Sequence, residues 1–167
     1  MKFQNAIALT GGIATGKSTA CNILRLHGHP IIDTDLIAHE VLEQSVDELV
    51  AIFGDEILDS RETSESSVDS SESNADSPLD SHESKPQINR KKLGSIVFSD
   101  KEKLRALEAI LHPKIRAVVK QKAQIFEAQN ITNFIDIPLF YELQERGDGY
   151  EIPKVLLIYT PREMQLA

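Results

Sequence analysis

The 167-residue sequence lacks several features, and each absence excludes a class of protein. It has a single cysteine, Cys21, so no internal disulfide or cysteine-rich zinc site can form, and we expect a reducing, cytoplasmic location. No run of about 18 apolar residues is present, which excludes a transmembrane helix. Near the start of the chain, the apolar run Ala6 to Leu9 has only four residues and is soon followed by glycines. A secretory signal peptide needs a longer apolar run, so we expect none here.

Positive charge is also scarce, because 18 Lys and Arg face 26 Asp and Glu, for a net charge of -8. An acidic chain is a poor general ligand for nucleic acid. Most of that charge lies in residues 59–84, which hold eight acidic residues, ten serines and one basic residue, so the rest of the chain is nearly neutral. The exclusion of nucleic acid therefore depends on the motifs described below.

Residues 59–84 contain only three apolar residues, too few to offset the entropy of ordering a chain. We predict a disordered insertion within one domain, residues 1–167. A phosphorylated or partner-binding segment is an alternative, although the composition is equally that of a solvated loop.

The remaining sequence alternates between strand and helix patterns. Strands are expected at residues 3–9, 30–33, 133–136 and 155–159, and helices at 17–26, 36–52 and 139–146. A further helix opens at Ser99, with Glu102 completing a capping box, and Pro113 is expected to break or kink it. This alternation predicts an α/β fold with a mostly parallel sheet between layers of helices.

The clearest motif runs from Gly11 to Ser18 and fits the phosphate-loop pattern G-x-x-x-x-G-K-[ST]. Its glycines let backbone N–H groups approach phosphate oxygens, Lys17 adds positive charge, and the Ser18 hydroxyl is a magnesium ligand. A strand precedes the motif and a helix follows it, as nucleotide binding requires. The predicted ATP-binding residues are Gly11, Gly12, Ile13, Ala14, Thr15, Gly16, Lys17, Ser18 and Thr19.

Two carboxylates, Asp33 and Asp35, follow the second strand, at the end where ligands of open α/β sheets bind. Phosphoryl transfer needs a group that orients the attacking hydroxyl or helps to hold magnesium. We expect at least one of the pair, with Lys17, to be catalytic. The alternative is that one Asp only caps the next helix.

Beyond these motifs, the sequence resembles the dephospho-CoA kinase family over nearly its whole length except the acidic insertion. The resemblance lies in these segments: 9–13 leading into the phosphate loop, 32–35 with Ala38-His39, Ile88-Asn89-Arg90, Leu107-Glu108, His112-Pro113, and 136–142 (DIPLFYE). It implies a P-loop kinase fold of three layers with a helical acceptor-side subdomain. It also implies transfer of the γ-phosphate of ATP, with Mg²⁺, to the 3′-hydroxyl of dephospho-CoA in coenzyme A biosynthesis.

Carried onto this chain, the resemblance implies acceptor-side roles for Asp33, Asp35, Arg90, His112, Asp136 and Pro138. Arg90 is equally well explained as a solvated charge at a helix start, and His112 as a residue that shapes a bend. Ala14 stands where the family usually has glycine. We expect a small effect of that alanine unless its backbone needs a positive φ.

The sequence ends at Ala167, where the family's next helix, with its lid arginines, would begin. We therefore expect a C-terminally truncated chain that keeps affinity for magnesium and phosphate but turns over poorly. A nucleoside or nucleotide kinase of the same architecture and a non-catalytic nucleotide-binding remnant remain alternatives. The expected partner is a small molecule, without nucleic acid or membrane, and the expected state is a monomer or weak oligomer.

Overall fold

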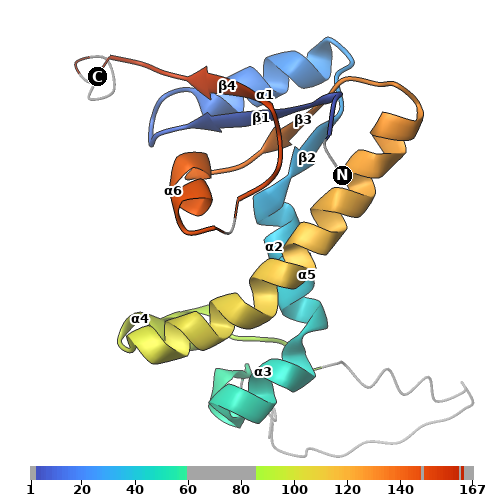
Figure 1. Cartoon of the computed structure of the whole chain (residues 1–167). Coiled ribbons are helices and arrows are strands. Elements are labelled where there is room, and N and C mark those ends of the chain that lie inside the picture. Colours follow the sequence, from blue (N-terminus) through green and yellow to red (C-terminus); the bar gives the residue numbers. More distant parts are fainter. Residues whose placement is uncertain (1–2, 60–85, 148, 162, 164–167) are drawn as a thin grey trace, which may run out of the picture.

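A parallel sheet forms the centre of the computed structural model, which describes residues 3–59, 86–147, 149–161 and 163 (Figure 1). The described strands lie in the order β2-β3-β1-β4, and every neighbouring pair is parallel. Their bounds are β1 Ala6–Gly11, β2 Ile31–Asp33, β3 Asn133–Asp136 and β4 Lys154–Ile158. The four predicted strands are therefore present, with β1 starting three residues later than predicted.

Helices cover both faces of the sheet, as the alternation of β1 requires (Figure 1). On one face Leu9 packs with Cys21 of α1 (Lys17–Leu26). On the other, Ala6 and Ala8 pack with Val119 of α5 and with residues of α2 and α6. The helices of this second layer are α2 (Thr34–Gln44), α5 (Lys101–Ala128) and α6 (Phe140–Glu145). The predicted three-layer α/β fold is confirmed.

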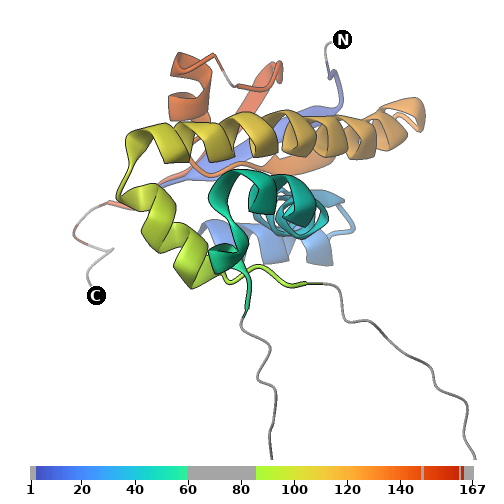
Figure 2. The ribbon, with the colours of Figure 1, turned by 90° about the horizontal axis from the view of Figure 1, so that it is seen from below.

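A second apolar cluster lies below the sheet, where α3 (Val46–Phe53), the 3-10 turn Asp55–Ile57 and α4 (Arg90–Phe98) meet the first half of α5. Leu49 and Ile57 are fully buried there. Figure 2, seen from below, shows α3 and α4 on the same side of α5. This helical part is continuous with the sheet layer through α2 and α5.

The predicted insertion, residues 59–84, lies outside the described residues except for Asp59. The chain on its two sides is paired: the amide of Asp59 donates to the carbonyl of Gln87 at 2.9 Å, and that of Asn89 to the carbonyl of Ile57 at 2.7 Å. A Leu58–Ile88 bridge lies between them. Residues 57–59 and 87–89, on the two sides of the predicted insertion, therefore lie side by side.

The helix predicted over residues 36–52 is wrong, because α2 ends and α3 begins around Ser45. Ser45 is buried, and its hydroxyl accepts a hydrogen bond from Lys114 Nζ at 3.0 Å. Both helices carry apolar residues at helical spacing, so periodicity could not reveal the change of direction.

The predicted helix start at Ser99 is also wrong. Of the break or kink predicted at Pro113, the break is wrong, because α5 runs without interruption over Lys101–Ala128. Asp100 caps α5 by accepting from the amides of Glu102 and Lys103 at 2.8 and 3.4 Å. Ser99 Oγ instead donates back to the carbonyl of Ile96 at 2.9 Å. The helix continues through Pro113, which is solvent-exposed, so water can satisfy the carbonyl that loses its intrahelical donor.

We expect Asp100→Ala to lower the free energy of unfolding by about 1 kcal/mol, because two amides of the first turn of α5 lose their acceptor. Asp100→Asn keeps an acceptor and should restore most of the loss. Urea denaturation followed by circular dichroism measures both, with Ser99→Ala as the matched control. A larger loss for Ser99→Ala than for Asp100→Ala would contradict the assignment of the cap.

Candidate functional site

The phosphate loop connects β1 to α1 and has a tightly fixed shape. Gly16 adopts a φ of 87°, and a Cβ added to Gly11 would lie 2.6 Å from the carbonyl oxygen of Ile158. Inside the loop, Thr15 Oγ1 donates to the carbonyl of Gly12 at 2.9 Å. Thr160 Oγ1, just after β4, donates to the carbonyl of Thr15 at 2.8 Å. Both glycines are therefore required by conformation or by space.

The first turn of α1 is arranged to attract an anion. The N-cap residue, Gly16, has no side chain that could accept hydrogen bonds from the first amides, and the turn contains no acidic residue. The amides at a helix start lack intrahelical acceptors, and the helix dipole places partial positive charge there. The residues of the loop therefore fit a nucleotide phosphate.

Lys17 lies beside Asp136, the last residue of β3, with Nζ 2.5 Å from Oδ1. The two side chains are only 18% and 13% exposed, so solvent screens this ion pair less than a surface pair. Cys21, one turn after Lys17 on α1, donates from Sγ to the other carboxylate oxygen at 3.4 Å. Thr34 Oγ1 donates to the backbone carbonyl of Asp136 at 2.7 Å.

Burial raises the pKa of the Cys21 thiol to about 11, and the negative charge of Asp136 and its hydrogen bond add to the effect. The thiol therefore stays protonated near neutral pH and remains a hydrogen-bond donor to Asp136.

Asp33 and Asp35 have different surroundings. Asp33 caps α2, because its Oδ1 accepts from the amides of Asp35 and Leu36, both at 3.1 Å. Its other carboxylate oxygen lies 3.9 Å from Arg25. Asp33 lines a cavity beside Arg25. Asp35, in the first turn of α2, lines a different pocket with residues of α5 and α6.

That pocket has a volume of about 190 Å³ and lies between α2, α5, α6 and the segment after β3. Two further predicted residues, His112 and Pro138, line it with Asp35. Its lining residues are Thr34, Asp35, Ala38, His112, Ile115, Arg116, Ile137, Pro138, Leu143 and Tyr150. Burial raises the pKa of the Tyr150 phenol, while the charge of Arg116 opposes that rise. Within this pocket the positive charge of Arg116 therefore favours the ionised form of the Tyr150 phenol.

Three of the predicted acceptor-side residues do not line this pocket. Asp33 caps α2, and Asp136 lies beside Lys17. Arg90, at the start of α4, contacts α2: its Nη1 lies 3.2 Å from His39 Nδ1, and Nη2 donates to Glu43 Oε1 at 2.9 Å.

Sequence reasoning did not select Thr34, Cys21, Arg116 or Tyr150. Helical spacing could have indicated two of them, since Cys21 lies four positions after Lys17 and Arg116 four positions after His112. Thr34 and Tyr150 carry no comparable signal. Among the described residues no group of three or more His, Cys, Asp or Glu is placed to hold a metal ion.

Ala14 has a positive φ of 59°. The small effect expected for alanine at this position assumed that its φ is not positive, so that expectation does not hold. A Cβ in the left-handed region costs roughly 1–2 kcal/mol. We expect Ala14→Gly to raise the free energy of unfolding by up to about 1 kcal/mol, since the added freedom of the unfolded chain offsets part of the gain. Thermal and urea denaturation check this.

The matched control is Ala117→Gly, at an exposed position within α5, where glycine should lower stability by about 1 kcal/mol. If both variants lose stability, the loop at Ala14 is not strained.

The Cys21 thiol should react with iodoacetamide at pH 8 roughly a hundredfold more slowly in the folded protein than in urea, because its pKa is raised to about 11. Its alkylation rate should keep rising with pH above 9, where that of an unfolded thiol levels off. Mass spectrometry follows the single cysteine directly. Equal rates in folded and unfolded protein would exclude this environment.

No helix in the described ranges combines the length and apolar character needed to cross a membrane.

Comparison with protein families matches this chain, over residues 5–64 and 80–167, to the family described as dephospho-CoA kinase. Residues 65–79, within the acidic segment, fall outside the match.

Individual relatives agree with the family match. The dephospho-CoA kinase of Wolinella succinogenes is 43% identical, over 96% of this chain and 67% of its own length. That of Helicobacter pylori strain J99 is 40% identical, over 99% and 71%. The solved structure of dephospho-CoA kinase from Campylobacter jejuni superimposes with a TM-score of 0.69 at 35% identity, over 98% of this chain and 69% of that one. The chain therefore belongs to the dephospho-CoA kinase family, the ATP-using P-loop kinases of coenzyme A biosynthesis.

Proposed function

We propose that this chain transfers the γ-phosphate of ATP to the 3′-hydroxyl of dephospho-CoA, with the phosphate loop as donor site and the pocket beside Asp35 as acceptor site. The observation that carries the proposal is the double contact of Asp136. Its carboxylate accepts from Lys17 in the loop, and its carbonyl accepts from Thr34 in the pocket wall. Donor and acceptor sites are thus adjacent, as direct transfer requires.

On the donor side, Lys17 and the amides at the start of α1 would bind the β- and γ-phosphates. The phosphates would compete with Asp136 for the ammonium group of Lys17. That group stabilises the negative charge that develops as the phosphoryl group moves. Mg²⁺ would neutralise phosphate oxygens, and the Ser18 hydroxyl is the proposed protein ligand. One protein ligand beside substrate phosphates is an ordinary arrangement for this ion.

On the acceptor side, Asp35 is the better candidate for orienting the 3′-hydroxyl and accepting its proton. The carboxylate of Asp33 is occupied by two amides of α2, whereas Asp35 lines the pocket. We assign His112 and Pro138 to the walls that position the ribose. Arg90 fixes α4 against α2 through His39 and Glu43, so its contribution is to hold the shape of the acceptor side.

A coupled assay that compares dephospho-CoA with adenosine and AMP tests the proposal. Preference for dephospho-CoA supports it, and preference for the smaller acceptors would favour the nucleoside or nucleotide kinase alternative. ATP binding without transfer to any acceptor would favour the non-catalytic alternative.

We further propose a cytoplasmic enzyme, in keeping with its single buried cysteine. We also propose that it is a monomer or weak oligomer.

The two aspartates should separate activity from stability. We expect Asp35→Asn to lower kcat by a factor of about 100 or more with little loss of stability, because a group in contact with the acceptor is neutralised. Asp33→Ala should lower the free energy of unfolding by about 1 kcal/mol, and Asp33→Asn should restore it, since asparagine also caps helices.

Kinetic assays and urea denaturation of the same preparations measure both effects. If Asp33→Asn loses as much activity as Asp35→Asn, the assignment of the base to Asp35 fails.

A further inference from the structure

The pocket beside Asp35 continues along α5 into a shallow groove of about 280 Å³. The groove is lined by Arg105, Glu108, Ala109, His112, Pro113 and Arg116. Counted from Arg105, they lie at positions i, i+3, i+4, i+7, i+8 and i+11, so they share one face of the helix. His112 and Arg116 line both cavities, so a ligand longer than a nucleoside would extend from the pocket over the groove.

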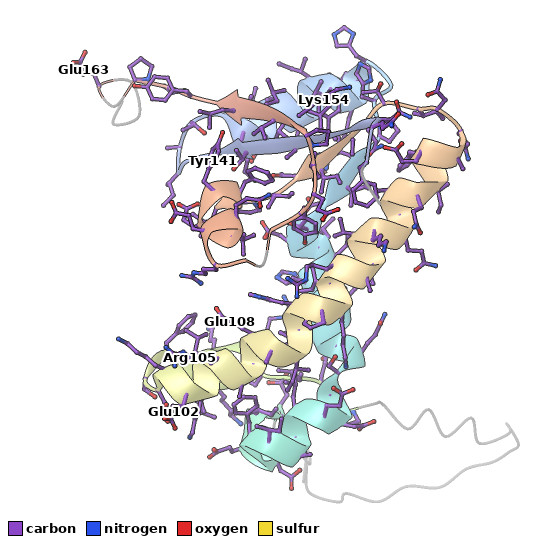
Figure 3. All side chains as sticks on the ribbon, in the orientation of Figure 1. Glu102, Arg105, Glu108, Tyr141, Lys154 and Glu163 are labelled. Carbon is purple, nitrogen blue, oxygen red and sulfur yellow. The ribbon has the colours of Figure 1, made fainter. Side chains whose placement is uncertain are left out.

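One lining residue of this groove, Glu108, forms an ion pair with a residue outside α5. Arg146 follows the last residue of α6, and its Nη1 lies 3.8 Å from Glu108 Oε1 on α5. Figure 3 shows Glu108 on the side of α5 that faces α6. The Arg146 side chain is 64% exposed and that of Glu108 34% exposed. A pair this exposed contributes little to stability, so exchanging its partner for a ligand anion costs the fold little.

The groove is rich in guanidinium groups. Arg105 and Arg116 line it, and Arg146, at the end of α6, pairs with its lining residue Glu108. Glu108 is the only acidic residue among those lining the groove. Guanidinium groups bind phosphate oxygens in a planar, two-point geometry, and binding of this kind is specific for anions.

We propose that Arg146 is a specificity-determining residue that binds a phosphate group of the acceptor over this groove, and that Glu108 holds Arg146 there until the acceptor replaces its carboxylate. This inference rests on the proposed function: dephospho-CoA carries a diphosphate between its adenosine and its pantetheine. With the ribose at Asp35, that diphosphate would lie toward Arg116 and the groove. Adenosine has no group to reach it.

The proposal predicts opposite effects for the two partners of one ion pair. Arg146→Gln removes the anion-binding group and should weaken dephospho-CoA binding by roughly ten- to a hundredfold, the usual range for hydrogen bonds to charged groups. Glu108→Gln removes the competing carboxylate and should tighten it a few-fold. Neither change should alter the affinity for adenosine. A purely structural pair would give two losses of similar size, without selectivity for the anionic acceptor.

Calorimetric titration with dephospho-CoA and with adenosine measures these affinities, with a non-hydrolysable ATP analogue and Mg²⁺ saturating the phosphate loop. Arg146→Lys retains positive charge and should keep most of the affinity. Lys122→Gln is the matched control, because it removes an exposed ion pair of 3.7 Å, to Glu40, from the same helix. Thermal denaturation confirms that each variant is folded. Raising the salt concentration should weaken dephospho-CoA binding more in the wild-type protein than in Arg146→Gln.

A wild-type protein that binds dephospho-CoA, with unchanged affinity in Arg146→Gln, would overturn the role of Arg146 and leave the proposed function intact. An equal loss for dephospho-CoA and adenosine would also overturn it. A wild-type protein that binds no dephospho-CoA would overturn both proposals.

Discussion

The contact between Lys17 and Asp136 joins the phosphate loop to the end of β3, 119 positions later in the sequence. Asp136 is held by three elements at once: its own strand, α1 through Lys17 and Cys21, and α2 through Thr34. A carboxylate only 13% exposed is costly to bury unless its oxygens are paired, and here both accept hydrogen bonds. The same pairing keeps the Lys17 ammonium at the phosphate loop, so one interaction both compensates the buried Asp136 carboxylate and positions Lys17.

The strand order makes that contact possible. β3 lies between β2 and β1, and the register pairs Asp136 with Leu9 on one side and with Asp33 on the other. Because all three strands are parallel, their carboxyl ends meet at one edge of the sheet. The phosphate loop, the start of α2 and the segment after β3 therefore converge there, although Asp33 and Asp136 are separated by the whole helical part and the acidic segment.

The local features of this site could be predicted from the sequence, and the non-local ones could not. The glycine pattern placed the phosphate loop between a strand and a helix, and an Asp after a strand indicated either a cap or a catalytic group. Choosing between these roles for Asp33 and Asp35 required knowing which carboxylate accepts the amides of α2 and which one lines the pocket with His112. The position of Asp136 required the strand order, which no local pattern contains. The helix boundary at Ser45 and the continuation of α5 through Pro113 were mispredicted for a related reason, since packing and solvent exposure outweigh local propensity there.

The strain at Ala14 shows how far the phosphate loop depends on the chain that follows β4. A non-glycine residue at a φ of 59° persists only where its surroundings determine the backbone. Those surroundings include the Thr15–Gly12 hydrogen bond, the hydrogen bond from Thr160 to Thr15, and the carbonyl of Ile158 against Gly11. Ile158 of β4 and Thr160 therefore help to fix the shape of the loop, although the sequence pattern there predicts only a strand. A substitution of Thr160 that removes its hydroxyl would therefore release the loop backbone at Thr15.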